Sequence, residues 1–348
     1  MPDRISERVW RVLACPRCGG ALARAEGEQG GARCPGCGEV FGRNEMGQLD
    51  LRLREGKRCR LEVEVPGSAA PPIAGGMSFE RLPRKADPEV DVTRVKGPCH
   101  LPQDLRSYFP RARGGGGDGA RGSHGSHGSH GSDAEVGGGE AHGTGGPGSG
   151  SGGGLALDLG CGAAVHQEVC ELAGFEYVGL DYGTPEAMVL GDAQALPFAG
   201  SSFELVLSIA VLEHVPFPLL MLREAWRTLE PGGAFLGTVA FLEPFHQESY
   251  YHHTHLGLLS ALRHAGFAVE RIAPAGGWPG LAAQANMSLF PGSPRWLSRA
   301  LVAPLLALHQ LWWRAGRLVE PAATESRRML ENSGALIFLA RKPGAVAH

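Results

Sequence analysis

Three short apolar segments are each followed by residues that could bind a ligand. The residues at these segment ends are Asp158, Gly160, Gly162, Asp181 and Asp192. In an open parallel sheet the carboxyl ends of the strands line the ligand crevice, and a glycine turn lets the backbone approach the ligand closely. An acid after the second strand can accept hydrogen bonds from both ribose hydroxyls, and an acid after the third can meet the adenine edge. The spacing therefore predicts a nucleoside-shaped pocket.

Four cysteines form two Cys-x-x-Cys pairs, and each pair is followed by glycine. The four are Cys15, Cys18, Cys34 and Cys37, with fifteen residues between the pairs. Two such knuckles supply four thiolates to a tetrahedral zinc ion. Because four thiolates leave no open coordination position, we expect a structural metal and not a catalytic one.

The elements that must position the acidic residues alternate between strands and helices from residue 155 onward. Helices are predicted near 217–229 and 254–265, and strands near 155–160, 177–181, 189–192, 203–209, 234–241, 267–272 and 335–341. This alternation predicts an α/β fold with a doubly wound, mostly parallel, seven-stranded sheet. Too few residues separate Asp181 from Asp192 for a full crossover helix, so we expect an abbreviated connection there.

Composition divides the chain into four parts. Residues 1–60 carry the cysteine pairs, 61–113 form a connecting segment with a short helix near 101–110, and 155–345 form the sheet domain with a helical insertion at about 276–334. Residues 114–154 are rich in Gly, Ser and His, and such a tract cannot bury enough apolar surface to fold. We expect a disordered linker there.

The overall composition disfavours several classes of protein. The net charge is −3 and the sequence pI is about 6.5, so nothing in the charge balance indicates a nucleic-acid partner. The first residues lack the apolar core of a signal peptide, and no apolar run reaches the ~18 residues of a membrane span. Cysteines in metal-type pairs suit a reducing compartment. We therefore expect a cytoplasmic protein for which nucleic acid is an unlikely partner.

Six sequence blocks resemble those of the class I S-adenosylmethionine (SAM)-dependent methyltransferases, the type 11 group in particular. The blocks are Leu155-Ala-Leu-Asp-Leu-Gly-Cys-Gly-Ala-Ala164, Gly179-Leu-Asp181, Gly191-Asp-Ala-Gln-Ala-Leu-Pro-Phe198, Ser202-Phe-Glu-Leu-Val-Leu-Ser208, Val211-Leu-Glu-His-Val215 and Glu224-Ala-Trp-Arg-Thr-Leu-Glu-Pro-Gly-Gly233. The resemblance implies a SAM cofactor and an antiparallel seventh strand. Ala164 departs from the family pattern, which has a third glycine there, and the extra methyl group is expected to weaken cofactor affinity.

The resemblance also implies roles for individual residues. It places Asp158, Gly160 and Gly162 around the methionine part of the cofactor. It places Asp181 at the ribose. It places Asp192 and Ala193 at the adenine edge. Ser208 ends the fourth predicted strand and is expected directly above the sulfonium.

The run from Leu13 to Phe41 resembles the zinc ribbon of the tRNA-methyltransferase activator proteins. Free activators of that family bind methyltransferase domains. The resemblance therefore implies that this ribbon packs on the catalytic domain of its own chain.

Histidines are concentrated in the loop after the fifth predicted strand, which should cover the acceptor site. They are His246, His252, His253 and His255. Methyl transfer requires removal of a proton from the acceptor, and neutral histidine is a suitable base near pH 7. We expect His246 to be the base. His214 is a second candidate, with a structural position near the cofactor as the alternative, and the loop histidines could equally be loop or helix-cap residues.

Residues 295–317, within the insertion, are apolar and rich in tryptophan, with arginine near both ends. The apolar run is too short to span a membrane, and Pro304 is expected to kink a helix. Tryptophan and arginine around an apolar face are typical of a helix in a membrane interface. A lid helix packed on the crevice is the alternative.

The sequence thus predicts a SAM-dependent methyltransferase with a structural zinc ribbon, acting in O-methylation of a small-molecule, glycan or lipid-linked acceptor. Peripheral membrane contact through 295–317 would suit the last. Two alternatives stay open. A ribosomal-RNA base methyltransferase is supported by the ribbon and by the basic residues Arg52, Arg54, Lys57, Arg58 and Arg60. A non-catalytic adaptor with this fold is mildly supported by Ala164.

Overall fold

The computed structural model describes residues 4–25, 30–54, 79–114, 153–244, 247–322 and 324–344. The linker expected over 114–154 lies almost wholly outside the described residues. So do three of the basic residues that supported an RNA substrate, Lys57, Arg58 and Arg60.

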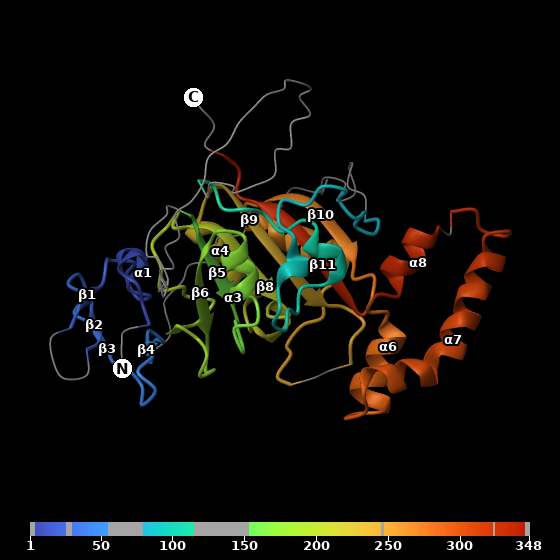
Figure 1. Ribbon diagram of the computed structural model, residues 1–348, viewed down its shortest axis with the longest axis horizontal. Coiled ribbons are helices and arrows are strands. Elements are labelled where there is room, and N and C mark those ends of the chain that lie inside the picture. The colour runs from blue at the N-terminus through green and yellow to red at the C-terminus, as the bar shows by residue number, and fades with distance from the viewer. Residues whose placement is uncertain are drawn as a thin grey trace, which may run out of the picture.

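A single large sheet forms the centre of the molecule (Figure 1). Its strand order is β10-β11-β9-β8-β5-β6-β7-β4. Seven of its strands are those expected from the sequence: β5 (Leu155–Leu159), β6 (Glu176–Asp181), β7 (Val189–Leu190), β8 (Phe203–Ile209), β9 (Leu229–Ala240), β10 (Ala268–Pro274) and β11 (Ala335–Arg341). All pairs among β5 to β9 are parallel, whereas β11 runs antiparallel to both β9 and β10. The expected antiparallel last strand is therefore confirmed.

The sheet has eight strands and not seven, because β4 (Leu49–Asp50) joins it from the N-terminal part of the chain. Leu49 pairs with Val189 and Asp50 with Leu190, parallel to β7. The backbone amide of Leu51 continues the ladder by donating to the carbonyl oxygen of Leu190 at 2.8 Å. This strand closes the hydrogen-bonding edge that the short strand β7 would otherwise expose.

Helices cover both faces of the sheet, as a doubly wound fold requires. One face packs against α4 (Pro218–Thr228) and α5 (His255–His264), and the other against α2 (Gln103–Arg106) and α3 (Gln167–Leu172). Proline at the start of α4 suits the first helical turn, and Thr254 caps α5 by accepting from the amide of Gly257. As expected, no helix connects β6 to β7.

The N-terminal module consists of α1 (Glu7–Val12) and a small antiparallel sheet of β1 (Ala23–Arg24), β2 (Ala32–Arg33) and β3 (Val40–Phe41). Trp10, Leu13 and Phe41 belong to the same buried cluster as the strands of the large sheet. The amide of Ala14 donates to Pro197 at 2.9 Å, and that of Ala199 donates to Val12 at 2.8 Å. The module thus packs on the sheet of its own chain, which confirms the expectation drawn from the activator resemblance.

The insertion before β11 lies at the opposite edge of the sheet from this module (Figure 1). It contains α6 (Gly280–Gln284), a π-helical turn η3 (Ala285–Leu289), α7 (Arg295–Gly316) and α8 (Glu325–Glu331). Helix α7 continues through Pro304. Within the described residues, none of the helices combines the length and apolar character needed to cross a membrane. Two 3-10 turns, η1 (Val92–Arg94) and η2 (Leu212–His214), complete the elements.

Candidate functional site

The glycine turn after β5 adopts left-handed backbone conformations at three positions. The φ angles are 60° at Gly160, 50° at Gly162 and 53° at Ala164. A Cβ atom at Gly160 would lie 2.7 Å from Cγ2 of Val211, so only glycine fits there. A Cβ atom at Gly162 would meet no described atom within 4 Å. The turn is therefore tightly packed on one side and open at Gly162, where a ligand could approach.

Asp158 is buried near the end of β5, with only 1% of its surface exposed. Its Oδ2 atom accepts a hydrogen bond from the Tyr177 hydroxyl at 2.8 Å and lies 3.0 Å from Nδ1 of His166. Oδ1 of Asp158 and Nε2 of His166 are also buried, and neither has a hydrogen-bond partner among the described residues. Burial and the neighbouring Asp158 raise the pKa of Tyr177, which keeps its hydroxyl protonated as a donor. These three residues hold two free polar atoms at the base of the glycine turn.

Asp181, at the carboxyl end of β6, joins the glycine turn to the next loop. Its Oδ2 accepts from the amide of Gly162 at 3.1 Å, while Oδ1 accepts from the amides of Gly183 and Thr184 at 3.0 and 3.3 Å. Thr184 returns a bond from its hydroxyl to the carbonyl oxygen of Gly162 at 3.1 Å. The side chain is only partly buried, so its carboxylate remains accessible to a ligand. The predicted ribose acid thus lies next to the open position at Gly162.

Asp192 follows β7, and its carboxylate organises the chain around it. Its Oδ1 accepts from the backbone amide of Gln194 at 2.8 Å and from the side-chain amide at 3.1 Å. The other side-chain atom of Gln194, Oε1, accepts from the amide of Phe217 at 3.1 Å. Ala193 lies partly buried between these residues. The segment at the predicted adenine edge is therefore tied to the start of α4.

Ser208, expected near the sulfonium, is completely buried near the end of β8. It pairs in register with Leu159 of β5 and Gly237 of β9. Its hydroxyl has no hydrogen-bond partner in the part of the chain that the structure describes. The residue belongs to β8, which lies between β5 and β9 in the sheet, and its assignment to the cofactor stays a prediction.

The candidate histidines are spread over several environments. His246, the preferred base, lies outside the described residues. His214 ends η2 and is partly exposed, while His252 is exposed. His255 begins α5 and packs edge-on against Phe79, with 4.7 Å between ring centroids. Burial lowers the pKa of His253 to about 4, with a smaller contribution from His252, so His253 is neutral at pH 7.

Glu213 is the titratable group that sequence reasoning passed over. It lies in η2 directly after β8 and is 1% exposed. Neither of its carboxylate oxygens has a well-aligned hydrogen-bond partner in the described residues. Burial raises the pKa of Glu213 to about 7, and the nearby Glu243 adds to the increase, against a partial lowering by backbone amides. A carboxyl group with a pKa near neutrality can exchange a proton at physiological pH.

Glu213, Glu243 and Trp278 follow three strands of the sheet, β8, β9 and β10, at their carboxyl ends. The indole Nε1 of Trp278 donates to Oε1 of Glu243 at 2.6 Å. Tyr250 and Tyr251 donate their backbone amides to the carbonyl oxygen of Glu213 at 2.6 and 3.2 Å, so the loop after β9 folds over η2. Carboxyl strand ends face the ligand crevice in such sheets. The three side chains therefore lie at the edge of the sheet where the sequence predicts the acceptor site.

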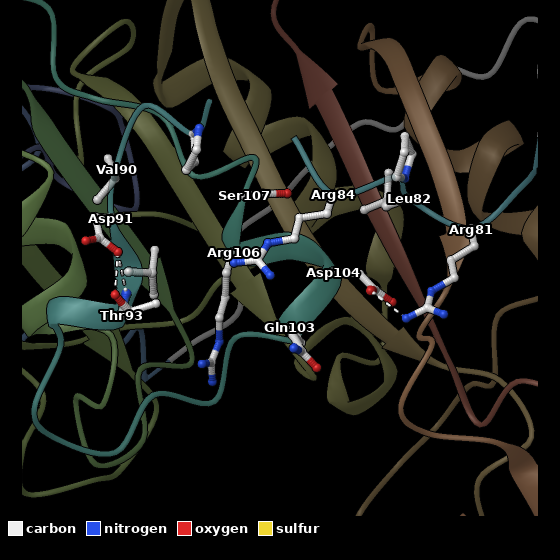
Figure 2. A pocket seen from close by; sticks show the side chains of 13 residues that line it. Arg81, Leu82, Arg84, Val90, Asp91, Thr93, Gln103, Asp104, Arg106 and Ser107 are labelled. Carbon is white, nitrogen blue, oxygen red and sulfur yellow. Dashed lines mark hydrogen bonds and ion pairs between the residues drawn. The ribbon is translucent and has the colours of Figure 1, made fainter. Parts of the chain in front are cut away.

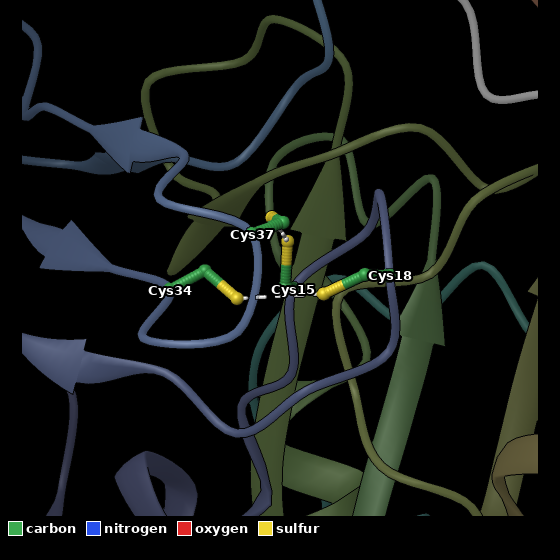
Figure 3. Close-up of side chains that lie close together, drawn as sticks. All are labelled: Cys15, Cys18, Cys34 and Cys37. Atoms are coloured by element: carbon green, nitrogen blue, oxygen red, sulfur yellow. Dashed lines mark hydrogen bonds between the residues drawn. The ribbon is translucent and has the colours of Figure 1, made fainter.

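The four cysteines converge from two loops of the N-terminal module (Figure 3). Their sulfur atoms all lie within 4.8 Å of one another, with Cys15–Cys37 and Cys18–Cys34 separations of 3.7 and 3.4 Å. Four ligands at about 2.3 Å from a tetrahedral zinc ion lie roughly 3.8 Å apart, so the spacing fits that metal. A backbone amide of Cys37 lowers the pKa of the Cys34 thiol to about 7, whereas burial raises that of Cys15 to about 12.

A separate cavity of about 430 Å³ lies beside α2 (Figure 2). Residues of the 81–107 segment line it, and none of the predicted cofactor residues does. Arg81 pairs with Asp104 at 3.1 Å, and Asp104 also accepts from the amide of Gly276 at 3.0 Å. These contacts connect the segment before the sheet domain to the carboxyl end of β10. The cavity is thus a feature of the connecting segment and not the predicted nucleoside pocket.

Comparison with protein families matches residues 157–237 to a family described as "Methyltransferase domain". The match begins within β5 and ends within β9, so it includes the glycine turn, Asp181 and Asp192.

Two curated relatives are similar to this part of the chain. An uncharacterised methyltransferase of Mycobacterium marinum is 34% identical over 103 residues, which is 26% of this chain and 40% of the relative. A ubiquinone biosynthesis O-methyltransferase of Ruegeria pomeroyi is 36% identical over 92 residues, covering 22% and 37%. The chain thus spans about two fifths of the length of the curated relatives that it matches.

Solved structures with similar chains include a complex that contains the Haloferax volcanii Trm112 methyltransferase activator. That match is 21% identical, with a TM-score of 0.38, over 56% of this chain and 84% of the other. A SAM-dependent methyltransferase from Mesorhizobium loti matches at 19% identity and a TM-score of 0.33, over 55% and 91%.

Proposed function

We propose SAM-dependent methyl transfer as the activity of this chain, which contains a methyltransferase domain over residues 157–237. One observation supports the proposal: the matched segment also contains the residues that the sequence predicts to line a nucleoside pocket. The open turn at Gly162 and the partly exposed carboxylate of Asp181 lie together there. The non-catalytic adaptor reading would leave these features without a ligand.

The residues present fit the cofactor. Asp158 Oδ1 and His166 Nε2 are free polar atoms beneath the turn, suited to the polar methionine end. Asp181 would accept from the ribose hydroxyls, and Asp192 with Ala193 would border the adenine. When bound, SAM supplies an electrophilic methyl group. The protein then has to orient the acceptor in line with that group and remove a proton from it.

We infer that the acceptor atom is a hydroxyl oxygen and that Glu213 removes its proton. Hydroxyl groups need a base, and a base works best when its pKa lies near the working pH. Burial raises the pKa of Glu213 to about 7, whereas it lowers the pKa of His253 to about 4. Glu213 therefore suits the role better than His253. The O-methyltransferase among the relatives is in keeping with this chemistry.

The four-cysteine cluster is proposed to hold a structural zinc ion. Its sulfur spacing fits tetrahedral coordination, and all four positions would be filled by protein ligands. Such an ion takes no part in the reaction and instead fixes the fold of the module.

The first test follows label from methyl-labelled SAM into a cell extract separated into RNA, protein, aqueous-glycan and organic-soluble fractions. Label in the glycan or organic fraction, lost in Asp181→Ala, would support a glycan or lipid-linked acceptor. Label in RNA would favour the ribosomal-RNA alternative instead. If no fraction is labelled, calorimetry with S-adenosylhomocysteine distinguishes a missing acceptor, where the product binds, from the adaptor, where it does not.

A further inference from the structure

Helix α7 exposes a stripe of large apolar side chains. Leu301, Leu305, Leu308 and Trp312 are 52%, 53%, 60% and 76% exposed. Their spacing of four, three and four residues places all four on one side of the helix. Leu318 and Val319, just beyond the helix, are nearly fully exposed as well. An exposed apolar surface of this kind indicates a contact with another protein or with a membrane.

The charges on this helix are all of one sign. Arg295, Arg299, Arg314 and Arg317 lie in or directly after α7, and the sequence has no acidic residue from 295 to 319. The chain as a whole has a net charge of −3, so this helix is a basic exception. With 3.6 residues per turn, Arg299 and Arg317 project from the side opposite the leucine stripe. The helix therefore combines an apolar side with a purely cationic polar side.

The N-terminal part of α7 is held firmly, whereas the rest extends from the body of the molecule (Figure 1). Ser298 and Val302 are its buried residues, and Ser298 accepts from the side-chain amide of Asn286 in η3 at 3.1 Å. Arg299 donates to the carbonyl oxygen of Gly277 at 2.9 Å. The stripe thus begins at an anchored end and is presented on a fixed helix.

We propose that α7 docks this protein on the surface of a membrane that contains anionic lipids. The leucine stripe would enter the boundary between headgroups and acyl chains, and the arginines would contact acidic headgroups. A second copy of the chain suits the helix less well. Pairing α7 with another α7 along the stripe would leave the cationic side of each helix without a partner, because neither helix has an acidic residue to pair with the arginines.

Docking would also bring the acceptor edge near the lipid. The guanidinium of Arg295 lies over the Trp278 ring, 5.8 Å from its centroid, and Trp278 is the residue that bonds Glu243. This consequence rests on the proposed function, but docking itself does not. A lipid-linked acceptor would be reached from such a position.

The test is sedimentation of the full-length protein with phosphatidylcholine vesicles, with and without phosphatidylglycerol. We expect binding to the anionic vesicles that weakens with added salt. Leu308→Glu and Trp312→Glu should each lower this binding about tenfold or more. The matched control is Gln310→Glu, which adds the same charge on the cationic side and should lower binding by no more than about fivefold, the effect of one charge near the surface.

Circular dichroism and the melting temperature show whether each variant folds, independently of any methyltransferase activity. Wild-type protein that stays in the supernatant with anionic vesicles would overturn the proposal. Equal binding by stripe and control variants would do the same. A dimer in analytical ultracentrifugation that the stripe variants dissociate, without vesicle binding, would assign the stripe to a second copy instead.

Discussion

The side chain of Gln48, in the N-terminal module, donates its amide to the carbonyl oxygen of Ala187 at 2.6 Å. The same amide reaches the carbonyl oxygens of Thr184 and Pro185 at 3.0 and 3.2 Å. Gln48 is 2% exposed, and these three carbonyls belong to the loop that follows Asp181. Since Asp181 accepts hydrogen bonds from amides of that loop, the N-terminal module helps to shape the proposed ribose end of the pocket.

Gln48→Ala should weaken both the fold and cofactor binding. The change leaves the buried carbonyl oxygen of Ala187 without its donor, which costs about 1–3 kcal/mol in the free energy of unfolding. The loosened loop should raise the dissociation constant for S-adenosylhomocysteine roughly tenfold, a cost of about 1.4 kcal/mol. Calorimetry measures both quantities. Glu45→Gln, at an exposed position of the same turn, is the control and should leave both unchanged. Wild-type affinity in Gln48→Ala would show that the module does not support the pocket.

Loss of the proposed zinc ion should destabilise the whole molecule and not the module alone. Trp10, Leu13 and Phe41 share a buried cluster with the large sheet, so a module unfolded by metal loss would expose part of that cluster. We expect Cys34→Ser to bind less zinc in elemental analysis and to melt at least several degrees lower. Cys99→Ser, a partly buried cysteine outside the cluster, is the matched control. Equal melting of the two variants would argue against a structural metal.

Most of the sheet could be predicted because its longer strands are continuous apolar runs between turn residues. Strand β4 could not, since two residues carry no periodic signal and Leu49–Asp50 form a strand only against the edge of β7. The predicted start of β9, at residue 234, was also wrong. Pro231-Gly-Gly233 predicts a turn before the strand, yet β9 begins at Leu229, which pairs with Phe203 across a register shift.

The site was predictable where position alone decides the role. Asp181 lies at a strand end because apolar residues precede it, and the glycine turn follows from the same pattern. The three amides that donate to Asp181 depend on the loop conformation, which the sequence pattern does not predict. Burial determines which groups can act as acid or base, because it raises the pKa of Glu213 and lowers the pKa of His253. Sequence reasoning favoured histidine because its ordinary pKa lies near 7.

Ala164→Gly should stabilise the protein. Ala164 has a φ of 53°, and this left-handed conformation costs a residue with a side chain about 1–2 kcal/mol. Glycine removes that cost, but it also increases the conformational entropy of the unfolded chain, which offsets part of the stabilisation. We expect a net increase of about 0.5–1 kcal/mol in the free energy of unfolding. Ala163→Gly is the matched control, because the neighbouring residue has no positive φ and should lose stability. Denaturant titration of the two variants decides the sign.

Glu213→Gln should lower kcat about 100-fold or more, because general-base catalysis contributes on that scale, while S-adenosylhomocysteine affinity stays within about twofold. In the wild-type enzyme kcat should increase as pH rises through about 7, where Glu213 ionises, and the variant should lose this dependence.

Stability gives an independent measurement of the same group. The folded-state pKa of Glu213 is raised from 4.5 to about 7. The stability contributed by the protonated group is therefore fully present below pH 4.5 and is lost as pH rises through 7. Glu213→Gln avoids this loss, so at pH 8 the variant should be more stable than wild type by up to roughly 3 kcal/mol. A variant that is less active but gains no stability at pH 8 would place Glu213 in a role other than that of a buried base, because a carboxylate paired in the native state would show the opposite pH dependence.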